Sequence, residues 1–481
     1  MNETATVLQR EDFIAGLGLP PHCILSEDSE LRPYECDGLS AYQQVPWLVL
    51  LPETVQQVQS ILGYCHQRKV AVVARGAGTG LSGGALPLAN GVLLSLARFN
   101  SILDIDLDNR LARVQPGVRN LAISQAVAQH GLYYAPDPSS QIACSIGGNV
   151  AENAGGVHCL KYGLTVHNIA QVKVVCMDGE LLNIGSHALD SAGYDLLALM
   201  TGSEGLLGVI VEVTVRLLPV PETAQVLLAA FDSVESAGHA VAGIISAGIL
   251  PAGLEMMDSL AIRAAEDFVH AGYPHDAAAI LLCELDGTRA EVETRISEVL
   301  TGMGARDVRL AHDDQERQKF WAGRKAAFPA VGRISPDYYC MDGTIPRKHL
   351  GKVLATISQW SSEYNLPVAN VFHAGDGNLH PLILYDANKP GELERTEEFG
   401  GRILELCIEV GGTITGEHGV GMEKINQMCV QFNDNELQQF HAIKKAFDPQ
   451  GLLNPGKAIP TLARCAEFGR MHVHGGELPF P

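Results

Sequence analysis

The sequence predicts an α+β protein of two units, the first rich in glycine loops and the second built on an antiparallel sheet with helices. A chain of 481 residues is too long for one ordinary hydrophobic core. The apolar pattern also changes after Pro219 and Pro221, which we take as the main boundary. We expect an N-terminal lead-in over residues 1–45, a ligand-binding domain over 46–222, a second domain over 223–446, and a C-terminal segment over 447–481 that returns to the ligand-binding domain.

The ligand-binding domain begins with an α/β pattern. Thr54 is a plausible N-cap for a helix whose apolar residues between positions 55 and 62 share one face. Residues 70–73 predict a short buried strand, and residues 102–106 and 111–115 predict a hairpin. Residues 120–130 predict a helix that ends at Gly131.

The second domain alternates strands with longer helices. Residues 226–231 and 279–285 are apolar strand candidates, and the simplest arrangement is an antiparallel sheet under helices. The apolar stretch 240–254 is too short to cross a membrane and is broken by glycine and Pro251. It predicts a buried helix that ends near Gly248 and is followed by a strand.

Composition and charge exclude several classes of protein. Apolar residues make up 46% and charged residues 19% of the chain, as in soluble globular enzymes. A net charge of −21 argues against nucleic acid and anionic membranes as partners. The N-terminus shows no secretory signal, and the eleven scattered cysteines include no C-x-x-C pair. We therefore expect a reducing cytosol, no disulfide framework and no ferredoxin-type cluster.

Two glycine-rich loops are the clearest signal in the first domain. Residues 75–84 read RGAGTGLSGG and residues 144–156 read CSIGGNVAENAGG. Because glycine lets the backbone approach phosphate oxygens, two such loops indicate a long, doubly phosphorylated ligand. The first loop leads into another apolar run instead of a helix, so a Rossmann domain is disfavoured and a flavin-binding loop of another kind is preferred. The first loop has no histidine or cysteine, so we expect no covalent flavin link through it.

The second domain carries candidate metal ligands in two glycine-rich turns. His373 and His380 lie seven residues apart, and Glu417 precedes His418 in the sequence TGEHGVG. Two imidazoles and a carboxylate could hold zinc or manganese with open positions, although single histidines are commonly hydrogen-bonded loop residues. His418 is either a general base or a structural neighbour, since imidazole titrates near neutral pH.

One basic element lies upstream of these turns. Arg324 is a candidate for binding a substrate carboxylate, because a guanidinium can grip both oxygens. Lys325 is its neighbour on the same helix and should point to a different side. The alternative is that both residues belong to a solvated helix face.

At these residues the chain resembles the flavoprotein superfamily of vanillyl-alcohol oxidase and p-cresol methylhydroxylase. Within it, the chain is most similar to the FAD-linked D-2-hydroxy-acid dehydrogenases, which include the FAD-linked subunit of bacterial glycolate oxidase. The resemblance rests on residues 75–85, 144–156, 202–205, 373–380 and 416–421. It implies a two-part FAD-binding domain of the p-cresol methylhydroxylase type and a substrate, or cap, domain.

The resemblance also implies roles for particular residues. FAD would be held without a covalent link, a divalent metal would be bound by His373, His380 and Glu417, His418 would be the catalytic base, and Arg324 would bind the substrate carboxylate. The residues expected to contact FAD are Arg75, Gly76, Gly78, Thr79, Gly80, Leu81, Ser82, Gly83 and Gly84 in the first loop, Pro136, Asp137, Ser145, Gly147, Gly148, Asn149, Asn153 and Gly155 around the second, and Glu204, Gly205, Gly208, Ile210 and Asn454 beyond it.

Two departures from the family bear on the substrate. Relatives that oxidise D-2-hydroxyglutarate have a lysine near Cys340 and an asparagine where Leu382 stands. The loss of these polar groups favours a smaller 2-hydroxy acid, glycolate or D-lactate, oxidised to the 2-keto acid by hydride transfer to the flavin. D-2-hydroxyglutarate remains the alternative substrate.

The resemblance further implies a partner that accepts electrons. The sequence shows no cluster motif and no membrane span, so we expect partner subunits that include an iron–sulfur protein, or a quinone or cytochrome acceptor. The expected location is the cytoplasm, or the inner face of the membrane through those subunits. Two rivals stay open: a non-catalytic flavin-binding electron-transfer subunit, and a flavin reductase using NAD(P)H, for which no dinucleotide fingerprint is present.

Overall fold

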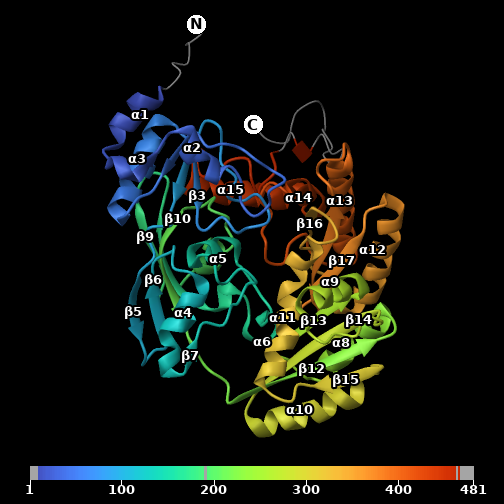
Figure 1. Cartoon of the computed structure of the whole chain (residues 1–481). Helices are drawn as coiled ribbons and strands as arrows, with labels where there is room; N and C mark the ends of the chain where they lie inside the picture. The colour runs from blue at the N-terminus through green and yellow to red at the C-terminus, as the bar shows by residue number, and fades with distance from the viewer. Residues whose placement is uncertain (1–8, 189–191, 462–463, 466–481) are drawn as a thin grey trace.

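The computed structural model describes residues 9–188, 192–461 and 464–465, and it shows two halves that lie side by side (Figure 1). The first half holds a four-stranded sheet in the order β1 (Ile24–Leu25), β2 (Leu48–Leu50), β4 (Val92–Ser95), β3 (Val72–Arg75). It also holds a five-stranded sheet in the order β5 (Ile102–Asp106), β6 (Leu111–Val114), β10 (Val209–Arg216), β8 (Ile169–Val175), β9 (Leu181–Gly185). A short pair, β7 (Leu132–Tyr133) and β11 (Leu218–Pro219), leads toward the second half.

The helices of the first half are short apart from α3. They are α1 (Arg10–Leu17), α2 (Asp28–Leu31), α3 (Val55–Arg68), α4 (Asn120–Val127), α5 (Ile146–Glu152), α6 (Cys159–Tyr162) and α7 (Leu196–Met200). Thr54 caps α3 as predicted, because its side chain accepts a hydrogen bond from Gln57 N. The lead-in packs into this half: β1 pairs with β2, and Phe13 of α1 contacts Trp47 and Tyr64.

The first glycine loop runs from strand to strand. β3 pairs in parallel with β4, which follows it directly along the chain, so the predicted strand–loop–strand arrangement is confirmed. The predicted hairpin is also present, since β5 and β6 pair antiparallel on either side of residues 107–110. This part of the chain therefore differs from a Rossmann unit in the element that follows the glycines.

The second half is built on one antiparallel sheet of seven strands, as predicted. Its order is β15 (Asp307–Leu310), β12 (Thr223–Phe231), β14 (Ala279–Gly287), β13 (Gly253–Asp258), β17 (Val368–His373), β18 (Asn378–Tyr385), β16 (Asp337–Cys340). The helices are α8 (Val234–Ser246), α9 (Ser259–Val269), α10 (Arg289–Gly302), α11 (Asp314–Val331), α12 (Leu350–Tyr364), α13 (Glu392–Glu409), α14 (Ile425–Gln431) and α15 (Asp434–Phe447). The predicted buried helix ending near Gly248 is α8, and β13 is the strand that follows it.

Helices cover both faces of this sheet, which explains its nearly continuous apolar strands. In β12, Leu227 and Ala229 pack on the face covered by α8, α12 and α13, whereas Val226 and Leu228 pack on the face covered by α9 and α11. A strand buried on both faces has no polar side to show. None of the described helices has the length and apolar character needed to cross a membrane.

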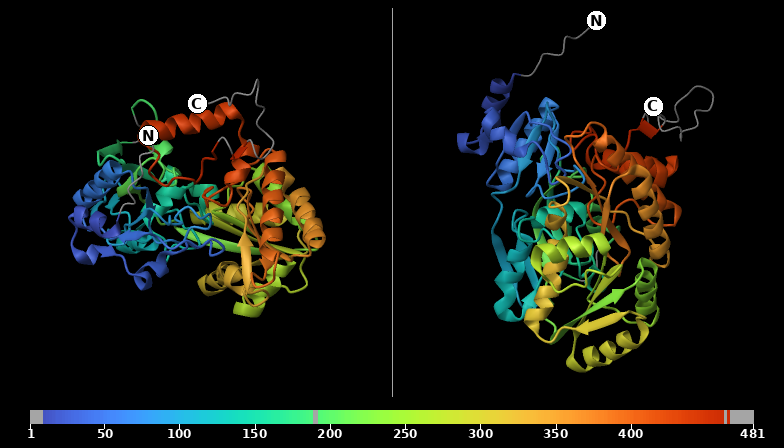
Figure 2. Two further views of the ribbon diagram at one scale, coloured as in Figure 1. Left: turned by 90° about the horizontal axis from the view of Figure 1, so that it is seen from above. Right: turned by 45° about the vertical axis from the view of Figure 1, so that its right-hand side comes forward.

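The chain returns to the first half after α15, which lies across the top of the molecule (Figure 2). Leu453 forms a parallel bridge with Val72 of β3, and Asn454 N donates to Val72 O at 2.8 Å. Lys457 is buried beside the first glycine loop and donates to Gly84 O at 3.0 Å. Residues 453–457, which follow α15 along the chain, therefore pack against β3 and the first glycine loop of the first half.

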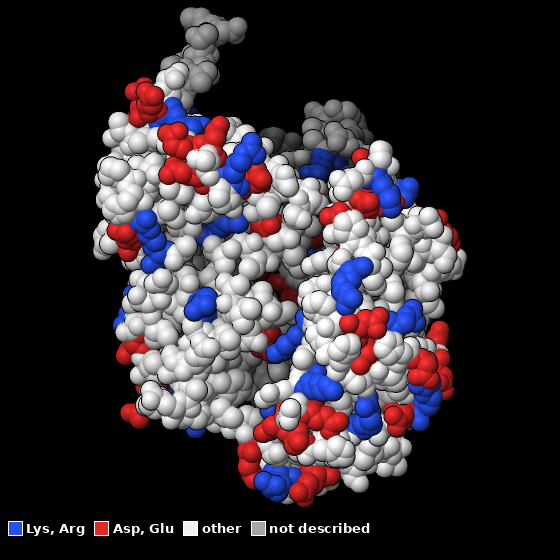
Figure 3. Space-filling model, viewed as in Figure 1, with Lys and Arg blue, Asp and Glu red and all other residues white. Residues whose placement is uncertain are grey.

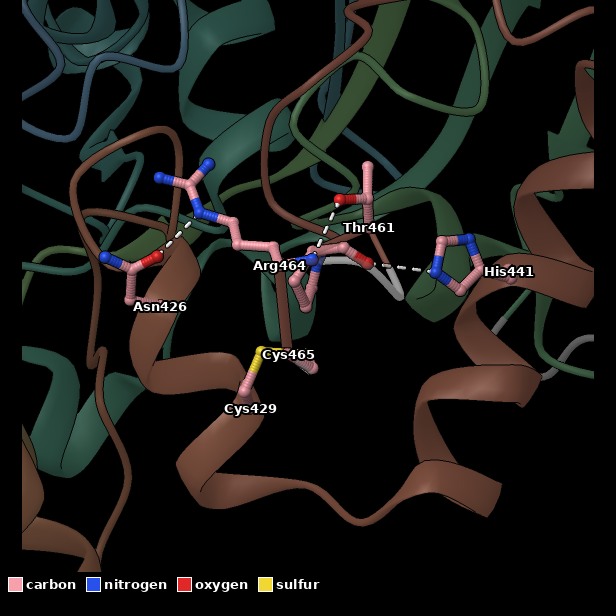
Figure 4. Close-up of a disulfide and its surroundings, with 7 residues drawn as sticks. Asn426, Cys429, His441, Thr461, Arg464 and Cys465 are labelled. Atoms are coloured by element: carbon pink, nitrogen blue, oxygen red, sulfur yellow. Dashed lines mark hydrogen bonds between the residues drawn. A yellow bond between two sulfur atoms is a disulfide. The ribbon is translucent and has the colours of Figure 1, made fainter. Parts of the chain in front are cut away.

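One disulfide joins Cys429 on α14 to Cys465, a single bridge that the sequence did not indicate (Figure 4). The other nine cysteines, all within the described residues, are free. Arg464 Nε donates to Asn426 Oδ1 at 2.6 Å, so a polar contact accompanies the bridge. The sequence did not reveal the pair because its members are 36 residues apart and meet only when the C-terminal segment folds back on α14.

The disulfide should stabilise the C-terminal segment. Closing a loop of 36 residues contributes about 4 kcal/mol through the entropy of the unfolded chain. We expect the Cys429→Ser/Cys465→Ser variant to be cut faster near the C-terminus in limited proteolysis than the oxidised wild type. Thiol titration of denatured, unreduced wild type should give nine free thiols. A count of eleven, or equal proteolysis rates, would contradict the bridge.

Candidate active site

One cavity of about 430 Å³ is lined by residues of both halves. The first half contributes the two glycine loops and the start of β10, and the second half contributes α11, His380 of β18 and the turn that carries Glu417 and His418. The space-filling view shows a narrow hollow between the halves with acidic atoms deep inside it (Figure 3). A long ligand lying along the glycine loops would therefore end against the cap domain.

The two glycine loops meet at one point of this cavity. A Cβ on Gly76 would overlap the hydroxyl of Ser145, so the first loop approaches the second more closely than a larger residue would permit. Ser145 in turn caps α5 by accepting a hydrogen bond from Gly148 N at 3.4 Å. The sequence predicted loops that share a ligand, and the structure brings them together.

Most of the residues predicted to contact FAD line the cavity. They are Arg75, Gly76, Gly78, Thr79, Gly80, Leu81, Gly84, Ser145, Gly147, Gly148, Asn149, Glu204, Gly205, Gly208 and Ile210. Ser82, Gly83, Pro136, Asp137, Asn153, Gly155 and Asn454 are not among the lining residues. Several of these shape the walls instead: Asp137 binds His158 at 2.8 Å, and Asn454 donates to Glu204 O at 2.7 Å.

The cavity also has lining residues that the sequence did not indicate. Asp37 and Glu152 are carboxylates at its wall, and Cys144 and Pro116 are small apolar contributors. Burial raises the pKa of both carboxyl groups. Glu152 belongs to the second glycine loop, so a search of every polar residue in that loop would have found it, whereas Asp37 lies in the lead-in and carries no comparable signal.

Glu417 is the point on which both predicted histidine ligands converge. Its Oε1 lies 3.3 Å from His373 Nε2 and 3.1 Å from His380 Nε2, and the two rings stand at 88° with centroids 5.0 Å apart. Burial alone would raise the pKa of Glu417, but the two histidines hold it well below its ordinary value. The residues predicted as metal ligands are therefore brought together.

The donor set suits a divalent ion. Asp342, His380, Glu417 and His418 offer donor atoms that all lie within 4.8 Å of one another, and His373 reaches the same carboxylate oxygen. Two imidazole nitrogens and a carboxylate oxygen are the ligands of many catalytic zinc centres. Gly155 of the first half lies so close to Glu417 that a Cβ there would stand 2.6 Å from Oε2, so this group reaches the boundary between the halves.

His418 faces the cavity from beside these groups. Its ring stacks on that of His380 at 5.0 Å, and its Nε2 lies 4.0 Å from Glu417 Oε1. Its buried Nδ1 has no hydrogen-bond partner among the described residues, and neither has Glu152 Oε2, which also lines the cavity. Burial lowers the pKa of His418 to about 4. Orphaned polar atoms on a cavity wall are typical of a site that takes a ligand.

Arg324 does not lie where the carboxylate-binding prediction requires. It is 2% exposed and is not among the cavity-lining residues, because its guanidinium is held by Glu255 through Nε and Nη2, each 2.8 Å from Oε2. Lys325 does face a different side of α11, as predicted, but that side is the cavity. The sequence analysis singled out Arg324, whereas its neighbour Lys325 is the residue that lines the cavity.

Comparison with known proteins gives the family. Residues 46–185 match the FAD binding domain, and residues 220–458 match the C-terminal domain of FAD linked oxidases. The chain is 68% identical to the glycolate oxidase subunit GlcD of Escherichia coli K12, over 100% of this chain and 96% of the relative. It is 31% identical to a D-lactate dehydrogenase of Anaerostipes hadrus, over 91% of this chain and 95% of that one.

A solved structure supports the same fold. Crystalline p-cresol methylhydroxylase with bound substrate superposes with a TM-score of 0.77, covering 95% of this chain and 98% of the other at 17% identity. This likeness confirms the predicted α+β fold, with a two-part FAD-binding domain of the p-cresol methylhydroxylase type and a cap domain on an antiparallel sheet. The chain belongs to the FAD-linked oxidase family.

Proposed function

We propose that this protein oxidises a small 2-hydroxy acid, glycolate or D-lactate, to the 2-keto acid, with FAD as the hydride acceptor. One observation carries the proposal: Glu417, His418 and His380 of the cap domain line the same cavity as the two glycine loops of the FAD-binding domain. A non-catalytic electron-transfer subunit would need only the part of this cavity that the glycine loops line. Relatives named as glycolate oxidase subunits and D-lactate dehydrogenases support the same substrate class.

The groups at the flavin end fit FAD. The cavity wall there is made of glycines from two loops in contact, which leaves room for a phosphate-bearing ligand against the backbone. When bound, FAD would supply the hydride acceptor for the substrate Cα hydrogen. The chain's own part is to shape the cavity so that the substrate lies between that end and the cap domain.

We assign His373, His380 and Glu417 to a zinc or manganese ion. When bound, the ion would act as a Lewis acid that lowers the pKa of the substrate hydroxyl. The fit rests on the convergence of both Nε2 atoms on one carboxylate oxygen, at 3.3 and 3.1 Å. Of these three residues, His380 and Glu417 line the cavity that the substrate would enter, and His373 contacts Glu417 from behind them.

His418 is the proposed base. Its ring lines the cavity and stacks on that of His380, which supports a role beside the proposed metal ligands. It would take the hydroxyl proton as the Cα hydrogen leaves. The structure gives it no competing hydrogen-bond partner at Nδ1 within the described residues.

Lys325 is the cation that we assign to the substrate carboxylate. Among the charged residues that line the cavity, the cations are Lys325 and Arg75, and Arg75 is engaged at the other end by Cys36 O at 2.7 Å. Lys325 is exposed, and no described residue forms an ion pair with it. In a chain with a net charge of −21, a free ammonium at this position supplies the attraction that an anionic substrate requires.

The surroundings of His380 favour a small substrate. Leu382 follows His380 on the same face of β18 and pairs across the sheet with Cys340 of β16, and both are buried. Phe328 of α11 lines the cavity and contacts the His380 ring edge-on at 6.3 Å. A second carboxylate would find no charged partner on these three side chains, so the pocket suits glycolate or D-lactate better than 2-hydroxyglutarate.

The electrons would leave through a partner. The chain has no C-x-x-C motif for a cluster, and two of its relatives are named as subunits of glycolate oxidase. We propose a multi-subunit complex in which an iron–sulfur protein or a quinone accepts the electrons. The FAD-loaded chain would then be the subunit that meets the 2-hydroxy acid.

Replacing the proposed base tests the reaction. His418→Ala should slow anaerobic flavin reduction by substrate about 10²- to 10⁴-fold, because general-base catalysis contributes this much. FAD content should match that of the wild type. His441→Ala is the matched control, since that imidazole lies outside the cavity and contacts Pro460 O at 3.0 Å. Flavin reduction at the wild-type rate in His418→Ala would remove His418 from the role.

Replacing the cavity cation tests substrate recognition. Lys325→Met should raise KM for glycolate or D-lactate about 10-fold or more, because a hydrogen bond to a charged group contributes roughly 1.5–3 kcal/mol. Lys319→Met is the control, because Lys319 is exposed on the same helix but does not line the cavity. An unchanged KM in Lys325→Met would show that Lys325 does not bind the substrate carboxylate.

A further inference from the structure

Glu255 is a carboxylate at the centre of the seven-stranded sheet, where it is 1% exposed. It stands on β13 directly opposite His373 on β17. Its Oε1 lies 2.8 Å from His373 Nδ1, and its Oε2 lies 2.8 Å from both Nε and Nη2 of Arg324. One oxygen of this carboxylate therefore contacts the histidine, and the other contacts the arginine.

Burying the Glu255 carboxylate costs desolvation free energy. A buried ion pair is on average no better than apolar residues of the same volume, and its neighbours Leu254 and Met256 on β13 are apolar. The contribution of Glu255 to the fold alone does not explain its presence. Its contact with His373, whose other ring nitrogen lies 3.3 Å from Glu417, supplies another reason.

That contact fixes the ring. A carboxylate at Nδ1 accepts the Nδ1–H hydrogen bond, so Nε2 is the ring nitrogen turned toward Glu417, 3.3 Å away, and it can ligate an ion once it carries no proton. The second histidine is arranged in the same way: His380 Nδ1 lies 3.3 Å from Met341 O, and its Nε2 lies 3.1 Å from Glu417. Both rings thus present the same nitrogen to one point.

We propose that Glu255, itself held by Arg324, is a positioning residue that orients His373 as a metal ligand. This inference rests on the metal centre proposed above. It gives Arg324 a role behind the site, where its two donors fix the carboxylate, in place of direct contact with the substrate. Glu255 and Arg324 then act on the ion through His373 alone.

The test is metal affinity, measured on the full-length, FAD-loaded protein by Zn²⁺ competition with a chromophoric chelator. Glu255→Gln should bind Zn²⁺ about 10- to 100-fold more weakly than the wild type, the usual effect of removing a partner of a metal-bound histidine. Its FAD content should be unchanged. Glu284→Gln is the matched control: Glu284 is buried on the neighbouring strand β14 and bonds Trp321 of α11, but does not touch His373. It should bind Zn²⁺ like the wild type.

A second variant covers the case in which Glu255→Gln fails to fold because Arg324 is left unpaired. Glu255→Gln/Arg324→Met removes both charges, and replacing a buried pair together is commonly tolerated. This double variant should fold, bind FAD and still bind Zn²⁺ 10- to 100-fold more weakly than the wild type. Wild-type Zn²⁺ affinity in either folded variant would overturn the positioning role while leaving the metal centre in place. Absence of Zn²⁺ binding by the wild type would instead overturn the proposed metal centre, and this inference with it.

Discussion

Two buried carboxylates, one from each half of the protein, hold the loop that carries Glu417 and His418. Asp342, two residues after the end of β16, accepts hydrogen bonds from the backbone N–H groups of residues 416–418. Glu204, from the FAD-binding half, accepts those of Val420 and Gly421 at 2.7 Å each. The loop is therefore fixed at both ends by charge-assisted hydrogen bonds, which are stronger than neutral ones. The side chains of Glu417 and His418 line the cavity from a loop whose backbone is held on either side.

A buried lysine, Lys424, lies among the carboxylates that hold this loop. Lys424 is fully buried, donates to Gly419 O at 2.8 Å, and lies 3.4 Å from Asp342. Burial alone would raise the pKa of Asp342, but His418, Lys424 and His380 hold it at about 2, so it stays ionised. The opposite charges within this cluster offset the desolvation cost of burying them. The cluster joins the two halves beside the proposed active site. Gly419 lies within this cluster and must be a glycine, because its φ is +83° and a Cβ would overlap Glu152.

Local patterns in the sequence predicted a large part of this structure. The Thr54 cap, the strand–loop–strand course of the first glycine loop and the antiparallel cap sheet each depend on neighbouring residues, and each is present. Long-range partners were missed. Glu255 meets His373 only through the register of β13 and β17, and whether Arg324 or Lys325 lines the cavity depends on how α11 is rotated above the sheet. The Cys429–Cys465 bridge likewise needs the returning C-terminal segment.

We propose above that the cap domain brings a metal ion and a base to the cavity lined by the glycine loops. Anaerobic titration of the FAD-loaded protein with glycolate, D-lactate, L-lactate and 2-hydroxyglutarate, followed by flavin absorbance before and after metal removal, tests it most directly. The account predicts bleaching by glycolate or D-lactate, its loss after treatment with a chelator, and its return when Zn²⁺ or Mn²⁺ is restored. Undiminished bleaching by the metal-free protein, or no bleaching by any of the four acids, would contradict it.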